Sequence, residues 1–194
     1  MKNILLALAV VLALAACAGN PRSRADLALY DLGPGPVQPS AAAYPGVALE
    51  VRLPVWLDAP AMSYRLTYAD PRRVHAYAQA RWAASPLLLL QQRLRQLLAL
   101  SAGGAPCLLR VELDEFSQSF ASPGGSSAVV RGEAQLFGKG GAAKGRRPLS
   151  LEVPAATADA AGGAAALALA SERLAAILNE WLQTQDLAAC RTAG

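Results

Sequence analysis

The sequence is short of the residues from which most catalytic and metal sites are built. It has one histidine, His75, with no second histidine and no cysteine near it in the sequence, so the ligand spacing of a zinc site is missing. No serine or cysteine stands in a recognisable nucleophile motif, and the acidic residues are scattered rather than paired for general acid–base chemistry. We therefore expect His75 to be a surface residue and the protein to have no catalytic residue, no metal site and no enzymatic activity.

Strong charge of one sign and a long hydrophobic run are also missing. The chain carries 18 Lys and Arg against 14 Asp and Glu, an excess too small to favour nucleic acid as a partner. The apolar run from Ile4 to Ala16 is shorter than the roughly 20 residues that a membrane-spanning helix needs. It follows the positive Lys2, as the apolar part of a secretory signal does.

The apolar run ends in a sequence typical of lipid-modified proteins. Leu14-Ala15-Ala16-Cys17 resembles the lipobox of bacterial lipoproteins, whose cysteine thiol receives a diacylglycerol and becomes the new N-terminus. We expect residues 1–16 to be a signal peptide and residues 17–26 a tether, with the covalent lipid on Cys17 in place of any cofactor. Ala18 follows the cysteine, at the position where an aspartate would act as a signal that retains a lipoprotein and keeps it from the outer membrane. The expected destination is therefore the outer membrane. The alternative is an ordinary signal peptide with a chance cysteine.

The two remaining cysteines fit an oxidising compartment. Disulfides form in the periplasm, whereas cytosolic cysteines stay reduced. We expect Cys107 and Cys190 to pair, which would attach the end of the chain to the strand that begins at Cys107. Two free thiols remain the alternative, because sequence alone carries no geometry.

Alternation of apolar and polar residues predicts strands in the first half of the chain. Expected are strands over 27–32, 47–57 and 62–68, the last two as partners, and a Pro/Ala-rich linker over 33–46. Pro54 lies in the second strand, so we expect an edge or a bulge there. Ser85 and Pro86 are typical of a helix start, and the leucines from Leu87 to Leu100 follow helical spacing. The pattern assigns no structure to residues 74–77.

The second half predicts three more strands and a long helix. The strands cover 107–116, 128–137 and 149–153, with connecting loops at 122–126 and 138–147. Consecutive strands should pair as antiparallel hairpins, and the helix should run from about Asp159 to Gln185. This order predicts an α+β fold, a largely antiparallel sheet with two main helices packed on one face, in a single periplasmic domain over 27–194.

The connecting loop at 138–147 is rich in glycine and basic residues. It lacks the Gly-Lys-Ser/Thr ending of a phosphate-binding loop and lies between two strands, so we expect a solvated hairpin loop. Contact of its basic residues with anionic lipid headgroups is the alternative.

Several segments, taken together, resemble one family. They are Leu29 to Leu32, Val51 to Pro54, Tyr64-Arg65, Arg81-Trp82-Ala83 before the leucine helix, and Leu109 to Phe116. In this order they are similar to the ABC-type transport auxiliary lipoprotein family. The resemblance implies an outer-membrane-anchored periplasmic lipoprotein that works with an inner-membrane ABC permease, its ATPase and an MCE-domain protein. The implied cargo is phospholipid or another hydrophobic molecule moved between the two membranes.

A second class of function stays open, namely a lipoprotein that scaffolds or activates other cell-envelope machinery. Self-association into a homo-oligomer also stays open. The resemblance centres on Trp82, which makes Arg81 and Trp82 the candidates for a partner interface, with Arg72 and Arg73 as charges at its rim. Two interpretations of Trp82 stay open, a core aromatic beside the start of the leucine helix and an anchor at that interface.

Overall fold

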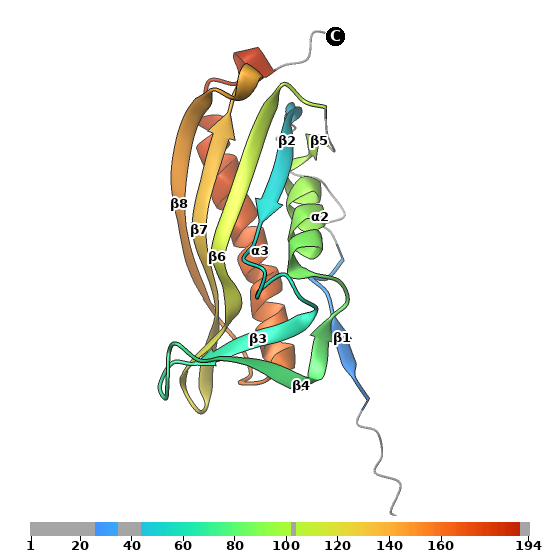
Figure 1. Ribbon diagram of the computed structural model, residues 1–194, viewed down its shortest axis with the longest axis vertical. Helices are drawn as coiled ribbons and strands as arrows, with labels where there is room; N and C mark the ends of the chain where they lie inside the picture. Colours follow the sequence, from blue (N-terminus) through green and yellow to red (C-terminus); the bar gives the residue numbers. More distant parts are fainter. Residues whose placement is uncertain (1–25, 35–43, 102–103, 191–194) are drawn as a thin grey trace, which may run out of the picture.

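The computed structural model describes residues 26–34, 44–101 and 104–190 (Figure 1). The expected signal peptide, Cys17 and nearly all of the tether lie outside this part of the chain, as does most of the expected 33–46 linker. The described elements are β1 (Ala28–Tyr30), β2 (Tyr44–Arg52), β3 (Ala61–Leu66), β4 (Val74–Trp82), α2 (Pro86–Leu98), β5 (Leu100–Ser101), β6 (Cys107–Ser122), β7 (Gly125–Phe137), η1 (Lys139–Gly141), β8 (Ala143–Pro154), α3 (Ala160–Gln183) and η2 (Ala188–Cys190).

The strands form one mixed sheet with β6 in its middle. β6 pairs antiparallel with β7, and β7 with β8, as the hairpin prediction requires. On its other edge β6 pairs in parallel with both β2 and β3, and the pairs β1–β4 and β2–β5 are parallel too. The α+β class is confirmed, whereas a largely antiparallel sheet is wrong. Helix α2 lies between β2 and β6 in the chain. It is part of the crossover connection that two parallel neighbouring strands require.

Both helices begin at side-chain caps. The Ser85 hydroxyl accepts the backbone N–H of Leu88, and Pro86 takes the first helical position of α2. The Asp159 carboxylate accepts the N–H of Gly162 at 2.8 Å at the start of α3. α3 packs across β6, β7 and β8, while α2 packs against β2 and α3, so one apolar core fills the space between helices and sheet (Figure 1).

Three boundaries differ from the sequence prediction. β2 ends at Arg52, before Pro54, and the expected partner strand β3 pairs instead with β4 and β6. β4 includes residues 74–77, which carry no apolar alternation because the first half of this strand is mostly exposed. The expected 138–147 loop is shorter, because β8 already begins at Ala143. The first half of β8 is mostly exposed, and its pairing with β7 keeps it extended.

β6 changes the face that it buries half-way along its length. Leu113 and the odd-numbered residues before it face the core, whereas from Phe116 onward the even-numbered residues do. The register with β7 shifts between Leu113 and Glu115, so Asp114 is an extra residue in a β-bulge. Opposite it lies Gly132, with φ +155°, where an added Cβ would stand 2.1 Å from the carbonyl oxygen of Glu112. The bulge therefore requires glycine at position 132.

Gly132→Ala is expected to lower the free energy of unfolding by about 2–3 kcal/mol, because both the backbone conformation and the steric contact oppose a side chain. Urea denaturation of the purified protein measures the change. Gly140→Ala is the matched control, since Gly140 also has positive φ, +75°, but nothing within 4 Å of an added Cβ. It should cost about 1 kcal/mol. Equal losses in the two variants would contradict the steric role of Gly132.

Candidate functional site

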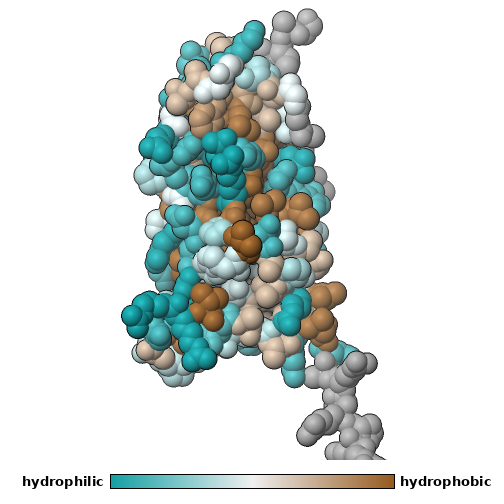
Figure 2. All heavy atoms as spheres, in the orientation of Figure 1, coloured by the Kyte–Doolittle hydropathy of each residue, from teal (hydrophilic) through white to brown (hydrophobic). Residues whose placement is uncertain are grey.

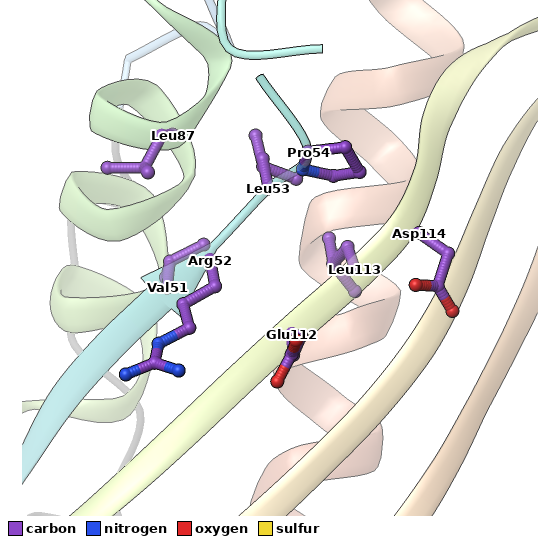
Figure 3. Close-up of a pocket in the computed structure, with 8 residues that line it drawn as sticks. All are labelled: Val51, Arg52, Leu53, Pro54, Leu87, Glu112, Leu113 and Asp114. Carbon is purple, nitrogen blue, oxygen red and sulfur yellow. The ribbon is translucent and has the colours of Figure 1, made fainter. Parts of the chain in front are cut away.

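The pairing of β2 and β3 with the same edge of β6 leaves a notch between them. β2 pairs with β6 as far as Arg52 and Glu112, and β3 joins β6 only from Gln118. Within the described part of the chain, β6 therefore has no neighbouring strand on this edge over residues 113–117. A pocket of about 330 Å³ opens at the β2 side of this notch (Figure 3). It is lined by Val51, Arg52, Leu53, Pro54, Leu87, Glu112, Leu113 and Asp114.

Residues from both faces of the sheet line the pocket because the sheet is open here. Figure 3 shows Leu87 on α2 facing Leu53 across the opening, with Leu113 and Asp114 on β6 at the other side. The apolar side chains form the floor, while Glu112 and Asp114 are exposed at the rim. The pocket can accept an apolar side chain of a partner, and the open edge of β6 offers backbone groups to an extended segment.

Exposed apolar side chains surround the pocket. Val55 is 90% exposed, Leu88 58% and Trp56 42%, and Arg65 lies over the Trp56 ring at 5.0 Å. Figure 2 shows hydrophobic residues between polar ones on this face. Exposed apolar residues that gather at one place are typical of an interaction site. The sequence signal for this site is Pro54, which lies two residues after the end of β2 and is followed by the apolar Val55 and Trp56.

A line of charged side chains borders the notch on the outer face of the sheet. Glu50 accepts hydrogen bonds from Arg52 and Arg110, each at 2.8 Å. Burial alone would raise the pKa of the Glu50 carboxyl, but the hydrogen bonds from these two arginines outweigh it and hold the pKa below its ordinary value. Glu50 is thus kept ionised and holds both guanidinium groups in place.

Trp82 is a core residue. It is 3% exposed, its ring centroid lies 6.2 Å from that of Phe116, and its backbone N–H donates to the carbonyl of Pro60 at 2.7 Å. A partner has no access to this side chain, so its expected role as an interface anchor is wrong. The last residues of β4 lie between β1 and β3, and this position turns Trp82 toward the core.

The three arginines of the expected interface are not brought together with Trp82 on one surface. The Arg81 guanidinium is half-buried and donates to the carbonyls of Tyr77 and Ala80 on its own strand. Arg72 and Arg73 lie in the turn between β3 and β4, where the Arg72 side chain is 92% exposed beside Asp70. Arg72 and Arg73 are accessible, and their role at a partner interface stays a prediction.

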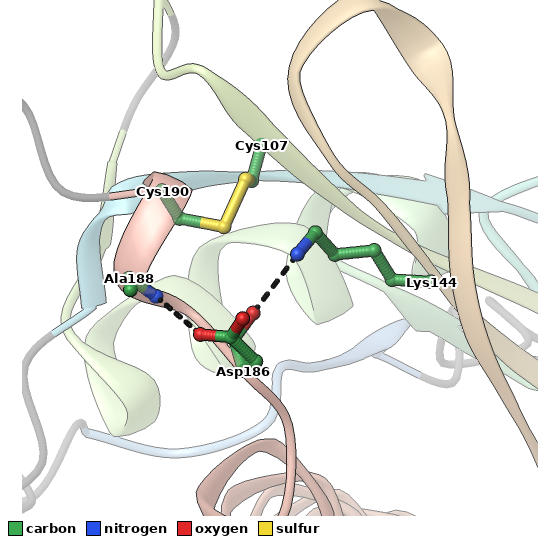
Figure 4. The surroundings of a disulfide bond; sticks show 5 residues. All are labelled: Cys107, Lys144, Asp186, Ala188 and Cys190. Atoms are coloured by element: carbon green, nitrogen blue, oxygen red, sulfur yellow. Dashed lines mark hydrogen bonds between the residues drawn. A yellow bond between two sulfur atoms is a disulfide. The ribbon is translucent and has the colours of Figure 1, made fainter.

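The disulfide between Cys107 and Cys190 is present in the structure (Figure 4). It joins the first residue of β6 to the short η2 turn that follows α3, with the two Cα atoms 5.3 Å apart. Lys144 of β8 also holds this segment, donating to the backbone carbonyl of Asp186 at 3.1 Å. Lys144 and Arg146, which the sequence assigned to a loop, are strand residues, and Arg146 pairs with Glu133 at 3.0 Å. The other cysteine, Cys17, lies outside the described residues.

The single histidine belongs to an aromatic group on β3, β4 and β6. The Tyr64 ring stacks on His75 at 5.1 Å and contacts Tyr77 at 4.6 Å and Phe120 at 5.6 Å. The Tyr77 hydroxyl donates to the buried amide of Gln118 at 2.8 Å. Burial raises the pKa of Tyr77, so it remains a protonated donor at neutral pH. Within the described residues, no three His, Cys, Asp or Glu side chains are grouped to hold a metal ion.

The sequence of the chain matches the model of a protein family. Its sequence model, that of the ABC-type transport auxiliary lipoprotein component, matches residues 30–178. The chain belongs to this family. The matched part of the auxiliary lipoprotein runs from the end of β1 into the second half of α3, and so includes the notch and Trp82. None of the curated proteins matches the chain.

Two crystal structures show the same fold as this auxiliary lipoprotein. One is a Xanthomonas campestris protein of family DUF330, with a TM-score of 0.66 and 19% identity, over 79% of this chain and 93% of the other. The second is an uncharacterised protein, with a TM-score of 0.64 and 16% identity, over 81% of this chain and 99% of the other. At these identities the likeness extends to the fold alone.

Proposed function

We propose that this protein is an outer-membrane-anchored periplasmic lipoprotein that serves as a non-catalytic component of an ABC/MCE-type system moving lipid between the two membranes. The family match over residues 30–178 is the observation that carries the proposal. The lipobox-like sequence ending in Cys17 stands just before the matched region and supplies the anchor. The partners are an inner-membrane ABC permease with its ATPase and an MCE-domain protein.

The notch is the docking site in this proposal. Its apolar floor takes an apolar side chain, and the exposed Glu112 and Asp114 favour basic residues beside it. An extended segment of the MCE-domain protein with this pattern pairs with the open edge of β6.

Cys17→Ala tests the anchor and the partners together. The variant, still exported, should leave the membrane fraction and should no longer crosslink to transporter components in its own cells. The measurement is membrane fractionation, followed by crosslinking, isolation and mass spectrometry of the wild-type chain and the variant. Leu53→Glu with the anchor intact is the matched control for docking: it should remain in the outer-membrane fraction while crosslinked partners decrease.

Two outcomes contradict the proposal. If the Cys17→Ala variant still associates with membranes through its N-terminus, Cys17 is not the lipid anchor. Isolation of the wild-type protein with other cell-envelope machinery, and with no MCE-domain or ABC component, would replace the transport function by the scaffold function.

A further inference from the structure

An apolar surface lies at the point where the described chain begins. Leu27 is 52% exposed and Leu29 64% exposed. Leu29 belongs to β1, a strand at the edge of the sheet that pairs with β4. Figure 2 shows hydrophobic residues at the lower right, where Figure 1 places β1. Exposed leucines on an edge strand are costly unless something covers them.

The first half of α3 continues this surface. Residues 160–171 of the helix include no charged side chain, whereas Glu172, Arg173 and Glu180 follow in its second half. Ala161 and Ala165 are exposed, and Leu169 is 41% exposed. A groove of about 430 Å³ between β1 and α3 joins the two parts, lined mainly by Leu29, Tyr30 and alanines of the helix. We call Leu27, Leu29, Ala161, Ala165 and Leu169 the tether-end surface.

The helical part of the tether-end surface is the exposed side of a core helix. α3 is long and apolar enough by composition to cross a membrane, with a mean hydropathy of 1.4, but 56% of its most apolar window is buried. The buried side packs on the sheet with Leu167, Leu174 and Leu178. The sheet and α2 cover part of α3, but the described chain leaves Ala161, Ala165 and Leu169 of this apolar helix exposed.

The place of Cys17 in the sequence indicates that a membrane covers the tether-end surface. Only the nine residues from Ala18 to Asp26 separate the expected lipidation site from Leu27, and they include Arg22 and Arg24. Fully extended, nine residues span about 30 Å. The exposed apolar residues around the notch lie further along the long axis of the molecule, near α2 and the end of β2, and Tyr68 and Val74 are exposed at the turn between β3 and β4 (Figure 1). The tether-end surface is therefore the apolar part of the domain closest to the anchor.

We propose that the tether-end surface binds the phospholipid surface of the membrane that holds the anchor, with Leu27 and Leu29 inserted at the level of the headgroups. This rests on the lipidation of Cys17 in the proposed function. The apolar contact and the anchor act together, since two membrane-binding elements hold a protein far more firmly than one. The contact sets the orientation of the domain, so that the disulfide end points away from the membrane.

The lipidated wild-type protein tests this in vesicles of phosphatidylethanolamine and phosphatidylglycerol that contain a phospholipid with a photoreactive group on its acyl chain. After irradiation, mass spectrometry locates the labelled residues. We expect labels on residues 27–30 and 161–169, and none around Lys139 or Ala188 at the opposite end. Leu27→Gln with Leu29→Gln should reduce the labelling of α3 about fivefold, with the melting temperature unchanged because both side chains are exposed.

Val55→Gln with Leu88→Gln is the matched control, since these exposed residues surround the notch; it should leave the labelling unchanged. Flotation of the vesicles tests the lipid anchor separately from the membrane contact of the tether-end surface. Protein that fails to float shows that the lipid anchor, and with it the proposed function, is wrong. Protein that floats with labels spread evenly, or absent, overturns the membrane contact. Crosslinks between two copies at β1, in place of lipid labels, would assign the surface to a second copy and overturn it too.

Discussion

The variant with both Cys107→Ala and Cys190→Ala is expected to lose about 4–5 kcal/mol of the free energy of unfolding. The bond closes a loop with a sequence separation of 83, and a loop of this length restricts the unfolded chain strongly. In the folded state the bond also attaches η2 to the start of β6. For a chain of this size, the melting temperature should fall by roughly 10–15 °C, which thermal unfolding measures.

The control for this prediction is Lys144→Ala, which removes the hydrogen bond to Asp186 but keeps the disulfide. It should cost about 1 kcal/mol, as exposed hydrogen bonds usually do. Reduction of the wild-type protein should reproduce the loss seen in the double variant. Two reactive thiols in the unreduced, denatured protein would show that the bond does not form and would contradict the prediction.

Trp82→Ala is expected to lower the free energy of unfolding by about 3–5 kcal/mol, because it removes a large buried side chain and leaves a cavity beside Phe116. Urea denaturation measures the loss. Trp56→Ala is the control: Trp56 is 42% exposed in the loop after β2, and its removal should cost about 1 kcal/mol. The two variants together separate burial from the general effect of removing a tryptophan.

An unchanged stability of Trp82→Ala, combined with the loss of crosslinked transporter components, would contradict the core position and restore the interface hypothesis for this residue. Loss of partners from the Trp56 variant at unchanged stability would instead support docking around the notch.

The elements that depend on local sequence were predictable. Ser85 with Pro86 marks the start of α2, and Asp159 marks the start of α3, because capping depends on a few neighbouring residues. The β6–β7–β8 hairpins follow from short connections between alternating segments. The disulfide was predictable from the two cysteines that remain besides Cys17, given the oxidising compartment that the N-terminal sequence predicts.

The remaining features depend on contacts between distant segments. The parallel pairing of β6 with β2 and β3 has no local signal, since the strands are separated by α2 and other elements. Residues 74–77 and 143–147 are strand residues with mostly exposed side chains, so apolar alternation could not reveal them. The bulge at Asp114 reverses the inward face of β6, which an unbroken alternation cannot represent.

The candidate site also combines features that the local sequence predicts with features that depend on contacts between distant segments. The apolar residues around Pro54 are visible in the sequence, but the notch exists only because two strands share one edge of β6 and leave part of it free. The direction of Trp82 depends on the register of β4 with β1 and β3. A motif identifies the family, whereas the side of the strand on which its tryptophan lies is decided by tertiary pairing.

The course of β6 has a mechanical consequence. The strand runs between the disulfide end of the molecule and the end near the tether, and its 16 residues span about 50 Å (Figure 1). A pull between the membrane anchor and a partner held beyond the notch enters through β1, passes through β4 and β3, and continues along β6. The hydrogen bonds that join β6 to its parallel neighbours β3 and β2 then carry part of this load. In the proposed function, the domain would thus transmit tension between its lipid anchor and its partner.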